Sequence, residues 1–106
     1  MKQEIEIKNQ VKYILSEIKK FSPGKSVELR IPLYAAIQCV SGINHRLGTP
    51  PNVVEMSAQT LLKLLENPNQ WQKFCDLGFI SASGTNSNLA DLFFEVSKLM
   101  NSGVGS

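Results

Sequence analysis

The first part of the chain carries apolar side chains at alternating gaps of four and three residues. They are Ile7, Val11, Ile14, Ile18 and Phe21. This spacing puts them in one stripe along a helix whose other sides carry Lys, Glu and Gln. Ser22-Pro23-Gly24 follows, and proline and glycine do not extend a helix comfortably. The pattern therefore predicts an amphipathic helix over residues 5–21.

The middle of the chain predicts three strands. Residues 27–31 alternate apolar and charged side chains, as in a strand with one buried face. Residues 34–40 are rich in aromatic, β-branched and small side chains and have no helix cap, which favours a second strand. Glycines and prolines make residues 41–52 a loop. Residues 53–56 then form a third short strand.

The second half begins with a helix over residues 58–66. Ser57 is a good N-cap for it, because its hydroxyl can accept a backbone N–H of the first turn. Asn67-Pro68 ends this helix, and Asn69 is expected to cap a second short helix. The apolar residues of that second helix are Trp71, Phe74 and Leu77. Gly78 suits the left-handed position that closes such a helix.

A strand of small residues over residues 79–83 leads through a glycine into a last helix, which Asn88 caps. The bulky apolar residues of this helix are Leu92, Phe93 and Val96. The small Ala82 and Gly84 just before it fit two arrangements: tight packing of the helix on the sheet, or space for an apolar guest. Both demand the same residue types, so the sequence leaves the two open.

The order α-β-β-β-α-α-β-α, without an internal repeat, predicts an α+β domain. In this fold class a small mixed or antiparallel sheet has helices packed on one face. A single domain over residues 1–100 fits the chain length of 106 residues. Residues 101–106 are rich in Gly and Ser and are expected to form a disordered tail.

Charge and hydropathy exclude several classes of partner. The net charge of +2 is too small to indicate nucleic acid, and no basic cluster with interleaved aromatics is present. No apolar run approaches the ~20 residues of a membrane span. Residues 1–4 lack the apolar core of a signal peptide. The sequence therefore predicts a cytoplasmic protein.

Residues capable of chemistry are few and scattered. The single histidine, His45, lies beside Arg46 in the loop, with no visible second ligand or paired nucleophile. A metal site would need convergent His, Cys or carboxylate side chains. Cys39 and Cys75 each lie in an apolar pattern and are expected to be reduced and structural. The sequence therefore predicts no catalytic residue, no metal and no cofactor.

Two stretches together resemble a known family. They are GTPPNVVE at residues 48–55 and GFISASG at residues 78–84, with a helical segment between them and a final helix after them. This arrangement resembles the sterol-carrier-protein domain, and most closely its short bacterial branch, over residues 27–99. The resemblance implies a hydrophobic tunnel between sheet and helices, which in the wider family holds sterols, fatty acids or fatty acyl-CoA without catalysis. The strand segment is shorter than in the animal carriers, which also allows a small or closed tunnel.

The apolar pattern and the resemblance together favour non-catalytic binding of an apolar small molecule or lipid. The expected lining of the cavity is Ile14, Ile18, Phe21, Ile37, Trp71, Phe74, Phe79, Ala82, Leu92, Phe93 and Val96. An alternative is a protein-interaction or enzyme-accessory module with a closed core, which contacts a partner protein through residues 44–52 or the first helix. A third hypothesis, an enzyme or accessory that uses His45 and Arg46, rests on those two residues alone.

Overall fold

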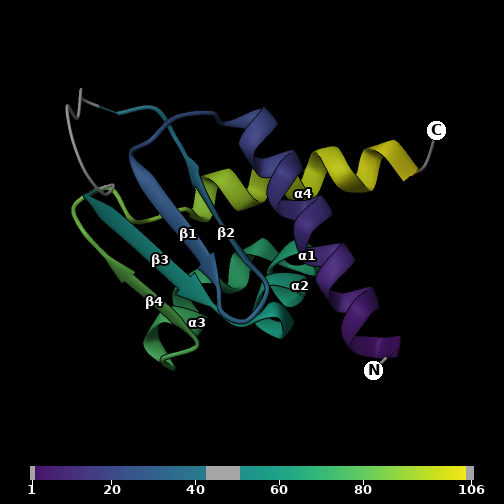
Figure 1. The fold of residues 1–106 in the computed structure, drawn as a ribbon. Coiled ribbons are helices and arrows are strands. Elements are labelled where there is room, and N and C mark those ends of the chain that lie inside the picture. The colour runs from purple at the N-terminus through teal and green to yellow at the C-terminus, as the bar shows by residue number, and fades with distance from the viewer. Residues whose placement is uncertain (1, 43–50, 105–106) are drawn as a thin grey trace.

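The order of helices and strands is the one that the sequence predicts. The computed structural model describes residues 2–42 and 51–104, and of residues 102–104 only the backbone. Its elements are α1 (Lys2–Phe21), β1 (Val27–Ile31), β2 (Ala35–Cys39), β3 (Asn52–Met56), α2 (Ala58–Glu66), the 3₁₀ helix η1 (Pro68–Gln70), α3 (Trp71–Asp76), β4 (Ile80–Ser83) and α4 (Ala90–Val104) (Figure 1).

The four strands form one mixed sheet in the order β2-β1-β3-β4. The central pair, β1 and β3, is parallel, and the two outer pairs are antiparallel. Alternate residues of β1 and β3 are buried, while the residues between them are half-buried or exposed. The buried face therefore points at the helices, and the prediction of an α+β fold with helices on one face is confirmed.

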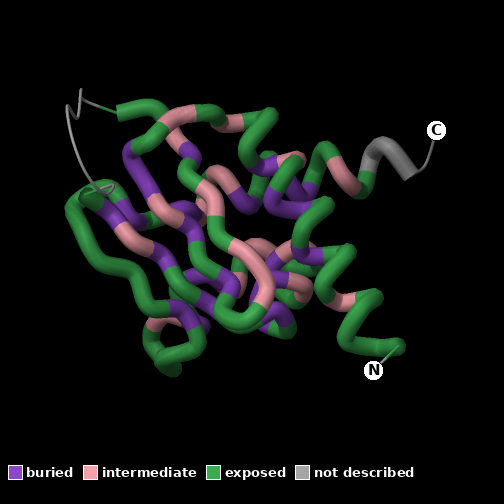
Figure 2. Tube along the Cα trace, viewed as in Figure 1, coloured by how far each residue is buried: buried purple, intermediate pink, exposed green. Residues whose placement is uncertain are grey.

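The core lies between the sheet and the layer of helices. Figure 1 shows α2, α3 and α4 behind the sheet, with α1 crossing next to β2. Buried segments follow the strands and the helix sides that face them (Figure 2). The ring centroids of Trp71 and Phe93 lie 6.0 Å apart at a small interplanar angle, which joins α3 to α4. Phe93 is fully buried, and Trp71 exposes only 3% of its surface.

Most of the predicted helix ends are confirmed. The hydroxyl of Ser57 accepts the N–H of Thr60 at 3.1 Å, as expected of an N-cap. The Oδ1 of Asn88 accepts the N–H of Ala90 at 2.9 Å. The cap assigned to Asn69 is wrong, because Asn67 accepts the N–H of Asn69 and so begins η1 instead. That short 3₁₀ turn leads directly into α3, which has no side-chain cap.

The last helix is longer than the sequence predicts. Residues 101–106 were expected to form a tail, but α4 continues to Val104. Two contacts favour this extension. Met100 packs against the core, and the side-chain amide of Asn101 donates to the hydroxyl of Ser97 one turn earlier, at 3.3 Å. Helical backbone thus continues past the point at which Gly and Ser become frequent.

The turn between β1 and β2 holds a leucine in a conformation that favours glycine. The N–H of Tyr34 donates to the carbonyl of Ile31 at 3.0 Å, which closes a four-residue turn. Pro32 is its second residue, and Leu33 is its third, with a φ of +75°. This φ is the one that a type II turn requires at that position. Leu33 is also 97% exposed, so no burial offsets its strain.

Replacing Leu33 by glycine is expected to stabilise the protein by about 1 kcal/mol, because glycine adopts positive φ without the Cβ clash. Leu33→Ala is the matched control, since it removes the exposed side chain but keeps the Cβ. Urea denaturation of both variants and the wild type measures the change. Equal stability of the glycine and alanine variants would contradict the strain argument.

Candidate apolar ligand site

Six of the eleven predicted lining residues belong to the core of the protein. Ile14, Ile18, Trp71, Phe74, Phe93 and Val96 each expose 7% or less of their surface. They come from α1, α3 and α4, and all belong to one cluster of buried apolar side chains. The structure therefore brings these six together.

The other five residues lie at or near the surface. Ile37 and Leu92 are half-buried, whereas Phe21, Phe79 and Ala82 are exposed. The ring of Phe79 is 56% exposed and meets the ring of Phe74 edge-on, with 6.0 Å between centroids. Of these five, Phe21 and Leu92 line one surface hollow, described below. The structure thus divides the predicted lining between the core and the surface.

The space between sheet and helices is densely filled. The side chains that meet there include Leu29, Ile31, Val54 and Met56 from the sheet and Leu15, Leu61 and Leu64 from the helices. All of them expose 2% of their surface or less. A passage wide enough for an acyl chain would leave its walls accessible to water. These side chains therefore contact protein, as in an ordinary close-packed core.

A hollow of about 630 Å³ opens between the end of α1 and the start of α4. We call it the α1–α4 hollow. It is lined by Phe21, Ser22, Val40, Ser41, Thr85, Asn86, Asn88, Leu89, Asp91, Leu92 and Glu95. Leu89 is buried and belongs to the core cluster, and Leu92 packs against that cluster. The hollow therefore has an apolar floor that continues into the core and a polar rim.

One wall of this hollow is conformationally strained. Val40, at the end of β2, has a φ of +67°, which is unusual for a β-branched residue. Its N–H donates to the carbonyl of Ser22 at 2.8 Å, and its carbonyl accepts the N–H of Ser26 at 3.0 Å. A Cβ at Gly24 would collide with that carbonyl. The segment after α1 therefore holds Val40 in place against the hollow.

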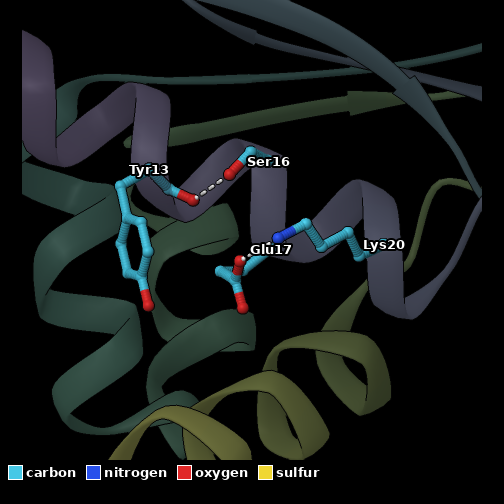
Figure 3. A network of polar contacts seen from close by, with 4 residues as sticks. All are labelled: Tyr13, Ser16, Glu17 and Lys20. Atoms are coloured by element: carbon cyan, nitrogen blue, oxygen red, sulfur yellow. Dashed lines mark hydrogen bonds and ion pairs between the residues drawn. The ribbon is translucent and has the colours of Figure 1, made fainter.

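A second hollow, of about 440 Å³, lies between α1, α2 and α4. We call it the three-helix hollow. It is lined by Gln10, Tyr13, Ile14, Leu62, Leu65, Glu66, Met100 and Asn101. Figure 3 shows Tyr13 on α1, whose carbonyl accepts the hydroxyl of Ser16 at 2.8 Å, and the nearby ion pair of Glu17 and Lys20 at 3.1 Å. Of the predicted lining residues, this hollow contains Ile14.

Gly84 does not leave room for a guest. A Cβ at this position would overlap the Oδ1 of Asn52 and come within 2.8 Å of the Pro51 carbonyl. Its φ of +106° also favours glycine. Of the two arrangements that the sequence left open, Gly84 therefore fits tight packing, because Asn52 and the backbone of Pro51 fill the adjacent space. Ala82 pairs with Val54 in the sheet but is exposed, since β4 is an edge strand.

Asn52, the last residue of GTPPN, joins three segments of the chain. Its side-chain amide donates to the carbonyl of Ser26 at 2.9 Å and lies 3.3 Å from the Ser26 hydroxyl. Its Oδ1 accepts the N–H of Asn86 at 2.9 Å. Asn52 is buried, so these bonds replace its bonds to water. The sequence placed Asn52 in the loop of residues 41–52 and carried no signal for these hydrogen bonds, because the partners lie 26 and 34 residues away along the chain.

The described residues show no arrangement for catalysis or metal binding. No group of three or more His, Cys, Asp or Glu that could hold a metal occurs among them. Burial raises the pKa of the Cys39 thiol to about 11, which disfavours the reactive thiolate. Burial, and then the charge of Asp76, raise the pKa of Cys75. His45 and Arg46 lie outside the described residues.

Across residues 2–42 and 51–104, no helix is long and apolar enough to cross a membrane.

A mixed four-stranded sheet with helices on one face defines this chain, over its described residues, as a small α+β domain. A family model described as "Bacterial SCP ortholog" matches residues 3–93, and the chain belongs to this sterol-carrier-protein-like bacterial family. The predicted family is confirmed, and the match also covers α1, which the resemblance over residues 27–99 did not include. A comparison with curated proteins finds no match to the chain.

Proposed function

We propose that this protein binds an apolar ligand without catalysis, and that the ligand enters the α1–α4 hollow. The ligand class is a fatty acid, a fatty acyl-CoA or a sterol-like lipid, as the sterol-carrier family suggests. The observation that carries the proposal is the hollow itself, whose apolar floor continues into the core. Its volume lies within the range of roughly 300–1,000 Å³ that is typical of small-molecule sites.

The strain at Val40 supports the choice of this hollow. Residues in rarely populated backbone conformations cost roughly 1–3 kcal/mol and cluster at ligand sites, where the surroundings hold them in place. Val40 is such a residue, and hydrogen bonds from both sides fix it against the hollow. The three-helix hollow contains no positive-φ residue among its lining residues.

In this proposal Phe21 and Leu92 contact the ligand directly. Of the remaining predicted lining residues, six are buried and would form a deeper passage between sheet and helices, namely Ile14, Ile18, Trp71, Phe74, Phe93 and Val96. Ile37, Phe79 and Ala82 lie at or near the surface and do not line the α1–α4 hollow. Because the core is filled, a ligand reaches that passage only by displacing core side chains. A short ligand, or the end of a longer one, needs only the hollow.

The proposal is non-catalytic because the described residues offer no reaction chemistry. A covalent mechanism needs a nucleophile with an adjacent base. The pKa of each cysteine is raised rather than lowered, so neither thiol is activated. No hydrogen bond joins either cysteine to a histidine or carboxylate within the described part of the chain. Binding is therefore favoured over turnover.

Leu92→Asn is expected to weaken ligand binding about tenfold, because it replaces apolar contact at the mouth of the hollow by a polar amide. A neutral fluorescent acyl-chain probe, titrated to saturation at about one probe per chain, measures the affinity. Leu62→Asn is the matched control, since Leu62 is also a half-buried helical leucine but lines the three-helix hollow.

Three outcomes separate the possibilities. Weaker binding in the Leu92 variant alone supports the α1–α4 hollow. Weaker binding in the Leu62 variant alone keeps the function but moves the site to the three-helix hollow. No saturable binding by folded wild-type protein would refute the proposal.

That last outcome would favour a second function, a protein-interaction or enzyme-accessory module with a closed core. The close filling of the space between sheet and helices supports this alternative. Exposed apolar side chains outside the hollows, including Leu33, Leu77 and Phe79, would then be candidates for contact with a partner protein.

A further inference from the structure

We propose that the α1–α4 hollow selects apolar ligands with an uncharged polar head, such as a hydroxyl group, and discriminates against carboxylates. This inference rests on the proposed function, because it concerns the ligand that the same hollow takes. Within the proposed ligand class it favours sterol-like lipids over the anionic fatty acids and fatty acyl-CoA, and it adds long-chain alcohols to that class.

The charged side chains among the described lining residues of the hollow are both negative. Asp91 and Glu95 lie four residues apart on α4, and both line the hollow. Its described lining contains no Lys, Arg or His. The other rim residues are neutral hydrogen-bonding groups, namely Ser22, Ser41, Thr85, Asn86 and Asn88. The rim can therefore hydrogen-bond a hydroxyl group but repels an anion.

Lys98, the cation that pairs with Glu95, also lies over a ring outside the hollow. Lys98 forms an ion pair with Glu95 at 3.6 Å, and both side chains are largely solvated. The ammonium group also lies 5.5 Å from the ring centroid of Phe94, which does not line the hollow. An exposed pair of this kind is weak, so Glu95 keeps much of its repulsion toward an incoming anion.

The start of α4 does not offer a free anion site either. Helix N-termini attract anions through unpaired N–H groups and the helix dipole. Here the side chain of Asn88 already accepts the N–H of Ala90, the first residue of α4. Asp91 supplies a negative charge within the first turn. These two groups of the protein weaken the attraction of the helix N-terminus for an anion.

The expected discrimination is about tenfold. A carboxylate head held about 6 Å from two like charges in water-like surroundings loses roughly that much affinity, and salt reduces the loss. An alcohol of the same chain length loses none of it. Neutralising the two carboxylates should therefore raise the affinity for a fatty acid selectively.

The test compares dodecanol and dodecanoate as competitors of the neutral fluorescent probe, near neutral pH and at low salt. Because the two compounds also differ in hydrophobicity, the measured quantity is the ratio of their inhibition constants in each variant. In the double variant Asp91→Asn/Glu95→Gln, the ratio of the inhibition constant of dodecanoate to that of dodecanol should be about tenfold lower than in the wild type. The single variant Glu95→Gln, at an exposed residue, should lower the same ratio by a smaller factor. Glu66→Gln removes a carboxylate from the three-helix hollow and should leave the ratio unchanged.

The outcomes distinguish this inference from the proposed function. If the probe binds saturably but the ratio does not move in the double variant, the selectivity is refuted and the binding function stands. A ratio that moves in the Glu66 variant instead also refutes it. If the wild type does not bind the probe at all, the proposed function itself fails.

Discussion

Gly84→Ala is expected to destabilise the folded protein by roughly 3 kcal/mol. Two physical effects add at this residue. A φ of +106° strains any residue with a Cβ, which costs about 1–3 kcal/mol. The Cβ would also overlap the Oδ1 of Asn52 and approach the Cα of Asn52 to 2.9 Å. Neither the backbone nor the hydrogen-bonded Asn52 can move away cheaply. Urea denaturation measures the loss.

Gly78→Ala is the matched control for this prediction. Gly78 also has a positive φ, of +83°, but no atom lies within 4 Å of the position of its Cβ. This variant should therefore be less stable by about 1 kcal/mol, from the backbone strain alone. The difference between the two variants isolates the close approach of Gly84 to Asn52 and Pro51. Equal losses in the two variants would mean that the close approach contributes nothing.

Asn52→Ala should cost roughly 3 kcal/mol, which lowers the folding equilibrium constant about a hundredfold. The change deletes the hydrogen bonds to the carbonyl of Ser26 and from the N–H of Asn86, both at 2.9 Å. Each buried group that loses its partner costs about 1–3 kcal/mol. The change also removes the side-chain link between Ser26, just before β1, and Asn86, in the turn before α4. Chemical denaturation followed by circular dichroism measures the effect.

Two further variants sharpen this experiment. Asn52→Asp keeps an acceptor for Asn86 but cannot donate to the Ser26 carbonyl, and it buries a charge, so it should be no more stable than the alanine variant. Asn69→Ala removes an exposed asparagine of η1 and should change stability by less than about 0.5 kcal/mol. If Asn52→Ala lost as little stability as Asn69→Ala, the hydrogen bonds of Asn52 would contribute nothing to the fold.

These two residues explain the stretches that carry the family resemblance. Asn52 ends GTPPN, Gly84 ends GFISASG, and the structure places them in contact. The strands that follow and precede them pair directly, with Val54 opposite Ala82. Where the structure describes them, at residues 51–55 and 78–84, these stretches connect the sheet to the turn before α4. Asn52 and Gly84 make contacts within the protein and do not line the α1–α4 hollow. In the proposed function, ligand specificity depends instead on Phe21, Leu92 and the carboxylates of α4.

The sequence determined the local structure well, because local structure depends on near neighbours along the chain. The 3.6-residue period of α1, the alternation in β1 and the cap at Ser57 each involve residues at most four apart. The structure matches all three predictions. The two errors in local structure, at Asn69 and at residues 101–104, also concern helix ends, where several caps compete.

Which residues meet at the candidate site depends on the tertiary structure alone. The sequence could not show that β1 pairs in parallel with β3, nor that β4 is an edge strand that leaves Phe79 and Ala82 exposed. It could not show why Gly84 is small, because an empty space and a close approach of backbone both require glycine. The α1–α4 hollow joins Phe21, Val40 and Leu92, which lie far apart along the chain. Such contacts depend on how elements pack in three dimensions, and no pattern of neighbouring residues encodes them.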